Sequence, residues 1–226
     1  MTDDGTSRPT ADHLPDDLAE VFPAYAEIGD DDLRDGVRDA YALALAETDW
    51  TDLAAVPWLP DEQARLGLPD ETNVTHVNDV TALATALADA LTDRRPGLGL
   101  DRDLVVAGAL VHDVSKLYEF APDQGGDAGS TRSAEGSDAD CESEGPAVRP
   151  GDSVATEYYD LLGHPYVGVH VCEAAELPVA LSHVVLSHTD RTTVEPATPE
   201  AVVVKRADEV AAAAIRSRAL DDLRDA

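Results

Sequence analysis

The sequence predicts an all-α protein with a single hydrophobic core. Three observations support this fold class. The apolar residues are mainly Ala, Val and Leu, aromatic residues make up only 4% of the chain, and no segment of useful length alternates apolar and polar residues. Ala and Leu are strong helix formers, and strands are recognised by a period of two. A chain of 226 residues, 43% of them hydrophobic, is expected to form one domain with additional segments.

The first part of the chain contains one clear helical pattern. Residues 1–30 are polar and contain prolines, and we expect them to be poorly ordered. A helix is predicted over 33–46. Apolar side chains recur there at four-residue steps on one face: Leu33, Val37, Tyr41 and Leu45. Residues 48–74 contain several prolines with Trp50 and Trp58, and they indicate a loop packed by its aromatic residues.

Five further helices are predicted from apolar periodicity and capping signals. The first spans about 76–91. The second spans about 104–116, is apolar almost all round and should be the most buried helix of the fold. Helices over about 164–176, 178–188 and 199–223 follow, and the 178–188 helix has proline in its first turn.

These helices divide the chain into two expected parts. Residues 1–73 are expected to form an N-terminal helical extension packed on the core, and residues 74–223 the main helical domain. The segment 121–156 interrupts that domain. It is acidic, rich in Gly, Ser and Asp, and lacks hydrophobic periodicity. We expect a mobile inserted loop, solvated and adapted to salt, although a role in contacting a partner is the alternative.

The charge balance is extreme. Asp and Glu total 46 against 16 for Lys and Arg, the net charge is -30, and only Lys116 and Lys205 are lysines. Such acidity is typical of proteins from salt-loving cytoplasms, where salt screens the repulsion between carboxylates, so we expect a halophilic origin. A negative surface repels nucleic acid at ordinary salt, and no DNA-binding module is evident. Molar salt weakens that repulsion, so an RNA end stays open as a substrate.

Other features favour a soluble cytoplasmic protein. No apolar stretch is long enough to cross a bilayer, and the N-terminus lacks the pattern of a secretory signal. Cys141 and Cys172 form no CxxC motif, so we expect neither a disulfide nor a cysteine-bound zinc ion. The sequence leaves the oligomeric state open, a homo-oligomer included.

Histidine and aspartate residues on inward helix faces form a candidate metal site. Asp208 lies on the face that also carries Val204, Ala211 and Ile215. A buried carboxylate needs a partner, either a metal, a helix end or an arginine. His188 lies on the inward face of its helix, whereas His183 is about 140° away and is expected to support the site or lie at the surface.

The other candidates are judged in the same way. His76 extends the apolar stripe of its helix, and His112 and Asp113 end the most buried helix. His164 aligns with the buried side of its helix, whereas His170 falls on another face, and His13 lies in the polar N-terminal segment. Imidazole with carboxylate suits Mn, Fe, Zn, Co or Ni better than Mg or Ca, and the lack of a thiolate disfavours a structural zinc site.

The order of these residues resembles the HD-domain metal-dependent phosphohydrolases. The resemblance covers about residues 74–216 without the inserted loop. The segment Ala109–Lys116, which reads Ala-Leu-Val-His-Asp-Val-Ser-Lys, looks like the motif around the family's His-Asp pair. The sequences around His164, His188 and Asp208 are similar to later motifs of the ribonuclease Y-like and HD-GYP-like branches.

The resemblance implies a role for each residue. One divalent metal would be held by His76, His112, Asp113 and Asp208. Asp113 would bridge to a second metal, bound also by His164 and His188, and Lys116 would reach a substrate phosphate. Two positions depart from the family pattern. Ser115 stands where the motif usually has Gly, and Thr189 stands where related branches often have a second histidine. One metal, with His164 and His188 positioning the substrate, is therefore the alternative.

The expected function is metal-dependent hydrolysis of a small nucleotide or other phosphate monoester by metal-activated water, with Asp113 and Lys116 as catalytic residues. A phosphodiesterase or 3′ exoribonuclease is the second hypothesis. A non-catalytic, metal-dependent sensor or interaction protein is the third.

Overall fold

The computed structural model describes residues 14–122, 159 and 161–220. Helices form the regular structure of this part of the chain, and its one extended pairing is an isolated antiparallel bridge between Pro57 and Thr72. The predicted all-α fold is therefore confirmed. Residues 123–156 of the expected inserted loop, and with them Cys141, lie outside the described residues, as does His13. Within the described residues, no helix combines the length and apolarity that a membrane span requires.

Among the described residues, the regular elements are α-helices and short 3-10 helices. The α-helices are α1 Asp31–Thr48, α2 Pro60–Leu66, α3 Asn73–Arg94, α4 Arg102–Val111, α5 Lys116–Glu119, α7 Tyr166–Ala174, α8 Val179–Ser187 and α9 Pro199–Ser217. The short 3-10 helices are η1 Leu18–Glu20, η2 Pro23–Glu27, η3 Leu53–Ala55 and η4 Pro96–Leu98.

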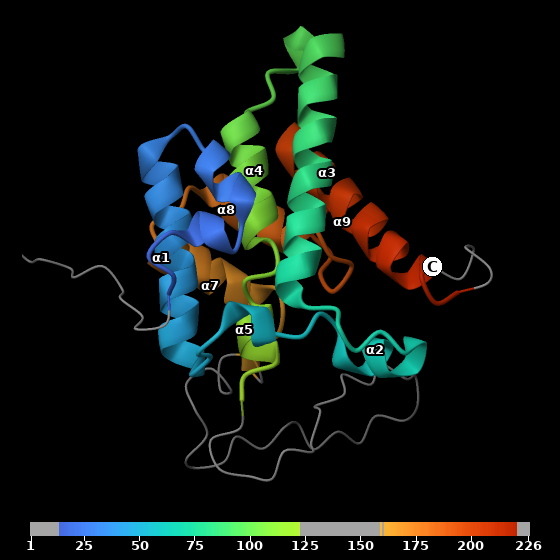
Figure 1. Ribbon diagram of the computed structural model, residues 1–226. Coiled ribbons are helices and arrows are strands. Elements are labelled where there is room, and N and C mark those ends of the chain that lie inside the picture. The colour runs from blue at the N-terminus through green and yellow to red at the C-terminus, as the bar shows by residue number, and fades with distance from the viewer. Residues whose placement is uncertain (1–13, 123–158, 160, 221–226) are drawn as a thin grey trace, which may run out of the picture.

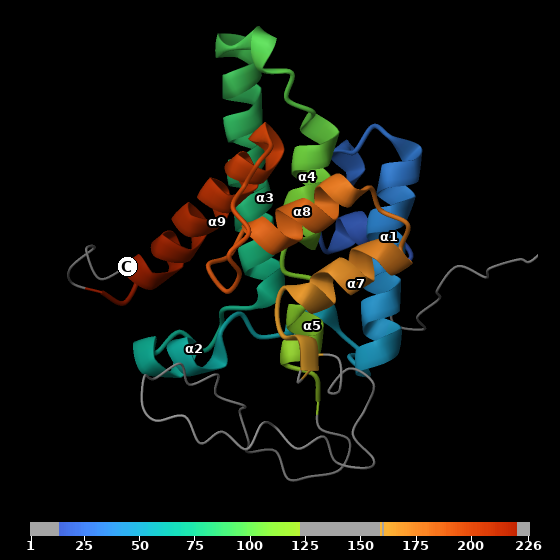
Figure 2. The same ribbon diagram turned by 180° about the vertical axis from the view of Figure 1, so that it is seen from behind.

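Helix α4 lies at the centre of the fold. It packs against α1, α3, α8 and α9, and Figure 1 shows it between α1 and α3. Seen from behind, α8 crosses in front of α4, and α7 lies below α8 and packs against it (Figure 2). The side chain of Asp101 begins α4 by accepting hydrogen bonds from the backbone N–H groups of Asp103 and Leu104. Every residue from Val105 to Val111 is buried, as the apolar composition of this helix predicts.

The expectation that residues 1–30 are poorly ordered is wrong for the part that the structure describes. Residues 14–30 form η1 and η2 and place four large side chains in the core: Leu18, Phe22, Tyr25 and Ile28. The ring of Phe22 lies 4.9 Å from that of Tyr41 on α1, centroid to centroid. The segment is polar on average, but these side chains supply enough apolar surface to hold it against α1 and α4.

The interpretation of residues 48–74 as a loop is also wrong in part, because η3 and α2 lie within it. Proline in the first turn starts α2, and Gly67, with a φ of 68°, ends it. The side chain of Gln63 accepts a hydrogen bond from Leu59 N and donates to the carbonyls of Leu68 and Glu71. Seven residues are too few to show a helical period, so the sequence pattern did not reveal α2.

Three helix ends in the structure differ from the predicted ends. The helix expected over 104–116 stops at Val111, and tighter turns lead into α5. At this end of the helix the His112 ring forms a hydrogen bond with the carbonyl of Ala109, and the ring thereby competes with backbone N–H groups for that carbonyl. The helix expected from 164 begins only at Tyr166, after Pro165, and α9 ends at Ser217. The division of the chain at residue 73 stays a prediction, since one core cluster joins side chains of the N-terminal segment to those of α4, α7 and α8.

Gly168 permits the close contact of α7 with α8. A Cβ atom at this position would lie 2.6 Å from Cγ1 of Val185. We expect Gly168→Ala to lower the free energy of unfolding by about 1–3 kcal/mol, because overpacking outweighs the better helix propensity of alanine. Urea unfolding at fixed high salt measures the change. Gly97→Ala is the matched control, because nothing lies within 4 Å of a Cβ at Gly97. An unchanged or raised stability of Gly168→Ala would contradict this packing argument.

Candidate metal centre

The structure brings all six predicted metal-site side chains together at one end of the central helix. They come from five separate segments. His76 lies in the first turn of α3, His112 and Asp113 follow the last residue of α4, and His188 follows α8. His164 lies just before α7, and Asp208 lies in the middle of α9. All are buried except Asp208, whose side chain is 21% exposed.

Local helix geometry orients two of the histidines. His112 and His188 stand at the C-terminal ends of their helices. Nδ1 of His112 lies 2.6 Å from the carbonyl oxygen of Ala109, and Nδ1 of His188 lies 2.8 Å from that of Val185. A carbonyl only accepts, so Nδ1 of each ring carries the hydrogen and donates it. The Nε2 atoms of both rings therefore present lone pairs to the site.

Asp113 lies between two groups of imidazoles. Its Oδ2 is 3.5 Å from Nε2 of His76 and 3.6 Å from Nε2 of His112. Its Oδ1 is 3.4 Å from Nε2 of His164 and 3.6 Å from Nε2 of His188. Each carboxylate oxygen thus faces a different pair of histidines.

Asp208 adds a second carboxylate to one of these pairs. Its Oδ1 lies 3.0 Å from Nε2 of His76 and 3.9 Å from Nε2 of His112. Two groups of potential ligands result, His76 with His112 and Asp208, and Asp113 with His164 and His188. Within each group the ligand atoms lie within 4.8 Å of one another.

Burial and mutual attraction set the ionisation of the centre. Burial lowers the pKa of His112, and it lowers the pKa of His164 to well below the usual value, so both rings are neutral at pH 7. Burial alone would raise the pKa of Asp113, but Lys116 and the surrounding imidazoles outweigh it and hold that pKa well below its usual range. Burial and Asp113 would raise the pKa of Asp208, but its bond to His76 and the charges of His76 and His112 together outweigh them and lower that pKa.

This arrangement fits divalent cations. Nε2 of His112 is buried and makes no hydrogen bond among the described residues. Lone pairs that face carboxylate oxygens repel them unless a cation lies between. Ligand atoms about 2.1 Å from one metal stand about 3–3.5 Å apart, and the carboxylate oxygens of the centre lie 3.0–3.9 Å from the Nε2 atoms that they face. Nitrogen and carboxylate oxygen donors together suit a divalent transition metal.

Lys116, the predicted phosphate-binding residue, lies beside the centre but is buried. Its Nζ donates a hydrogen bond of 3.2 Å to the carbonyl oxygen of Trp58 and lies 3.9 Å from Oε2 of Glu119. Trp58 also packs on the ring of His76, with 5.8 Å between the ring centroids. Lys116 therefore contributes positive charge to Asp113 from a fixed position in the core.

Two residues that the sequence analysis did not place in the site also contact it. Ser115 Oγ lies 2.6 Å from Nδ1 of His164, and Glu119 Oε2 lies 3.5 Å from the same atom. Ser115 was noticed only as a departure from the family motif. Glu119 is one of 46 acidic residues, and its position three residues after Lys116 gave the only available signal.

The remaining described histidines and the described cysteine lie apart from the two ligand groups. His183 Nε2 accepts a hydrogen bond from the backbone N–H of Ala197, and His170 Nε2 lies 3.7 Å from Glu47 Oε2. Cys172 is a buried free thiol whose pKa burial raises to about 12.

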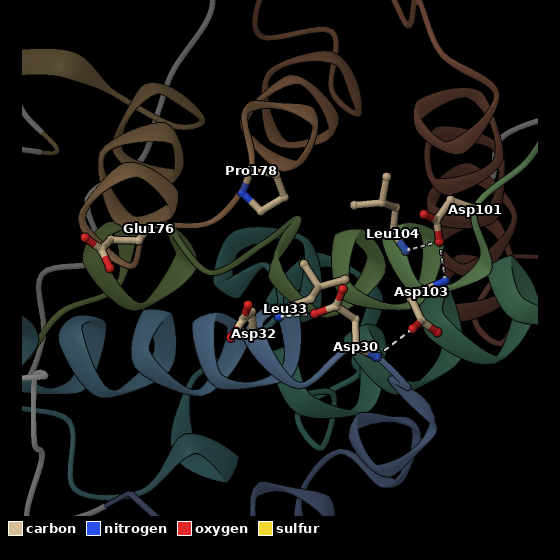
Figure 3. Close-up of a pocket in the computed structure, with 8 residues that line it drawn as sticks. All are labelled: Asp30, Asp32, Leu33, Asp101, Asp103, Leu104, Glu176 and Pro178. Atoms are coloured by element: carbon tan, nitrogen blue, oxygen red, sulfur yellow. Dashed lines mark hydrogen bonds between the residues drawn. The ribbon is translucent and has the colours of Figure 1, made fainter.

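An acidic cavity lies at the opposite end of α4, between the starts of α1 and α4 and the turn before α8 (Figure 3). Its volume is about 270 Å³. Three of its carboxylates have structural partners. Asp30 and Asp101 cap α1 and α4, and Asp103 accepts hydrogen bonds from the backbone N–H groups of Gly29 and Asp30. These three carboxylates therefore have structural roles, as helix caps or as acceptors for a neighbouring backbone segment.

Comparisons with known proteins agree with this geometry. The family model of the HD domain matches residues 73–213, more than half of the chain. The dihydroneopterin 2′,3′-cyclic phosphate phosphodiesterase of Methanocaldococcus jannaschii is 26% identical to this chain over 139 residues. The alignment covers 60% of this chain and 44% of that relative, so the chain spans less than half of its length. No solved structure matches the chain significantly. With the family model spanning all six residues of the centre, the chain belongs to the HD-domain family.

Proposed function

We propose that this protein hydrolyses phosphate esters at a centre of two divalent metal ions. The observation that carries the proposal is the position of Asp113, whose two oxygens face separate pairs of histidines. In this proposal His76, His112 and Asp208 would hold one metal, and His164 and His188 would hold the other. Asp113 would be available as a ligand to both. The alternative of one metal leaves His164 and His188 to position the substrate.

The chain's own residues define the chemistry of the site. Divalent metals supply Lewis acidity, which activates water as a nucleophile and stabilises charge on a phosphoryl group. Asp113 fixes the distance between the two ligand groups. Lys116 places a positive charge beside them that offsets negative charge developing on the phosphate. Burial lowers the pKa of His112 and of His164, which keeps these two rings neutral and therefore able to act as ligands.

The donor set and the relative narrow the proposal further. Imidazole and carboxylate ligands favour Mn, Fe, Co, Ni or Zn over Mg or Ca. The name of the archaeal relative supports a small phosphodiester, including a cyclic phosphate, as the substrate class to test beside nucleotide monoesters. A 3′ RNA end is proposed as a substrate only at high salt, because the net charge of -30 repels RNA when salt does not screen it. The proposed halophilic origin makes molar salt the condition for each assay.

The metal content of single-ligand variants tests the centre. Wild-type protein is expected to bind two metals per chain, and Asp208→Asn and His188→Asn one each. Asp113→Asn should weaken both sites and reduce kcat/KM about 1,000-fold, because metal stabilisation of the transition state is worth several kcal/mol. Plasma mass spectrometry and phosphate-release assays measure these effects. His183→Asn is the control, because the His183 ring accepts a hydrogen bond from the backbone of Ala197 and belongs to neither ligand group. Full activity in Asp113→Asn would refute the site.

The two lysines of the chain provide a matched test of charge at the centre. Lys116→Met is expected to lower kcat/KM about 100-fold, because a buried cation beside the developing charge is lost. Lys205→Met removes the other lysine, which pairs with the exposed Asp190, and should change kcat/KM by no more than about twofold. Steady-state kinetics at fixed metal and salt measure both variants. Equal effects of the two substitutions would count against a catalytic role for Lys116.

A substrate panel separates the candidate activities. Nucleoside 2′,3′-cyclic phosphates, linear phosphodiesters, nucleotide monoesters and short RNA are compared with Mn²⁺ or Co²⁺ at high salt. We expect turnover of small phosphodiesters to exceed that of RNA, because a net charge of -30 repels a polynucleotide more strongly than a small ester. Chromatography of the products measures turnover. Tight metal binding without turnover of any phosphate ester would favour the sensor hypothesis instead.

A further inference from the structure

The ring of His164 is held by different contacts from those that hold His112 and His188, the two histidines that follow helix ends at the centre. His112 and His188 donate from Nδ1 to carbonyl groups of their own helices. His164 precedes α7, so no preceding turn of that helix lies behind its ring. Its Nδ1 contacts side chains of a distant segment instead, with Ser115 Oγ at 2.6 Å and Glu119 Oε2 at 3.5 Å.

Both contacting groups are buried and fixed in place. Ser115 is fully buried, and the side chain of Glu119 is 6% exposed. Oε1 of Glu119 accepts a 2.9 Å hydrogen bond from Arg191, and Lys116 Nζ lies 3.9 Å from Oε2. Oε2 makes no hydrogen bond among the described residues. These neighbours leave the second carboxyl oxygen directed at the His164 ring.

We propose that Ser115 and Glu119 are positioning residues that keep the hydrogen of His164 on Nδ1. This inference rests on the proposed metal centre. A neutral imidazole carries one N–H, and a hydrogen on Nε2 would block the atom that faces Asp113. A hydroxyl acceptor and a nearby carboxyl oxygen both favour the Nδ1–H form, and such partners raise the basicity of a metal-binding histidine.

The arrangement makes a selective prediction about the two metals. The segment that follows α4 supplies Asp113, which faces both groups. Among the six predicted ligands, however, its Ser115 and Glu119 contact His164. Loss of either contact should lower the affinity for the metal that His164 and His188 would hold. The affinity for the metal that His76, His112 and Asp208 would hold should not change. Ser115 occupies the place of the glycine in the motif that this segment resembles, so the hydroxyl contact is a property of this chain.

Metal titration of two variants tests the inference. Isothermal titration of metal-free protein with Zn²⁺ at high salt is compared for wild type, Ser115→Ala and Glu119→Gln. We expect both variants to weaken one of the two binding steps about 10- to 100-fold and to leave the other unchanged. Ser182→Ala is the control, because Ser182 is a buried serine on α8 outside the centre. Both steps within about twofold of wild type in both variants would overturn the inference.

A tautomer measurement separates this inference from the proposed function. Nitrogen-15 NMR of the histidine rings in metal-free protein reports which nitrogen carries the hydrogen. We expect His164 to be the Nδ1–H form in wild type and a mixture in Ser115→Ala. An Nε2–H ring in wild type overturns the inference even if metals bind. Absence of metal binding in wild type overturns the proposed function. In that case the tautomer of His164 still tests whether Ser115 and Glu119 position its ring. Circular dichroism checks that each variant folds. If Ser115→Ala does not fold, the result for Glu119→Gln tests the inference.

Discussion

The burial of Asp113 among four imidazole rings is the constraint on which the centre depends. Its two oxygens lie 3.4–3.6 Å from four Nε2 atoms, and Nδ1 of His112 and of His188 is already engaged by a carbonyl. The Nε2 atoms of those two rings therefore direct their lone pairs at a carboxylate. Cations between its members would stabilise such a cluster, because buried polar groups without partners cost free energy. Metal binding and the stability of this part of the fold are therefore coupled.

The small residues of the core allow the ligands to meet. A Cβ on Gly108 of α4 would lie 3.2 Å from Val184 of α8, and one on Gly168 of α7 would lie 2.6 Å from Val185. Each glycine lets two helix backbones approach closely, as small residues do at helix contacts. The ends of α4 and α8 and the start of α7 then lie close together. The Ala- and Val-rich composition therefore serves the site as well as the core.

The sequence predicted helix faces well and helix ends poorly. Asp208 could be placed because Val204 and Ala211 mark the buried face of a long helix. The helices η1, η2 and α2 were missed, because short helices show no period. His164 was placed in a helix although it lies before one. The contacts of Ser115 and Glu119 with it join positions 49 and 45 residues apart, and no local pattern carries that information.

The distribution of charge explains how a chain with a net charge of -30 could accept a phosphate ester. Both lysines are buried, and Lys116 and Arg191 pair with Glu119 beside the centre. Long-range repulsion of an anion comes from exposed carboxylates, which molar salt screens over about 3 Å. Contacts inside a desolvated centre are screened far less. Salt should therefore remove the barrier to approach while leaving the attraction at the site, so an acidic surface and a phosphate-binding centre are compatible.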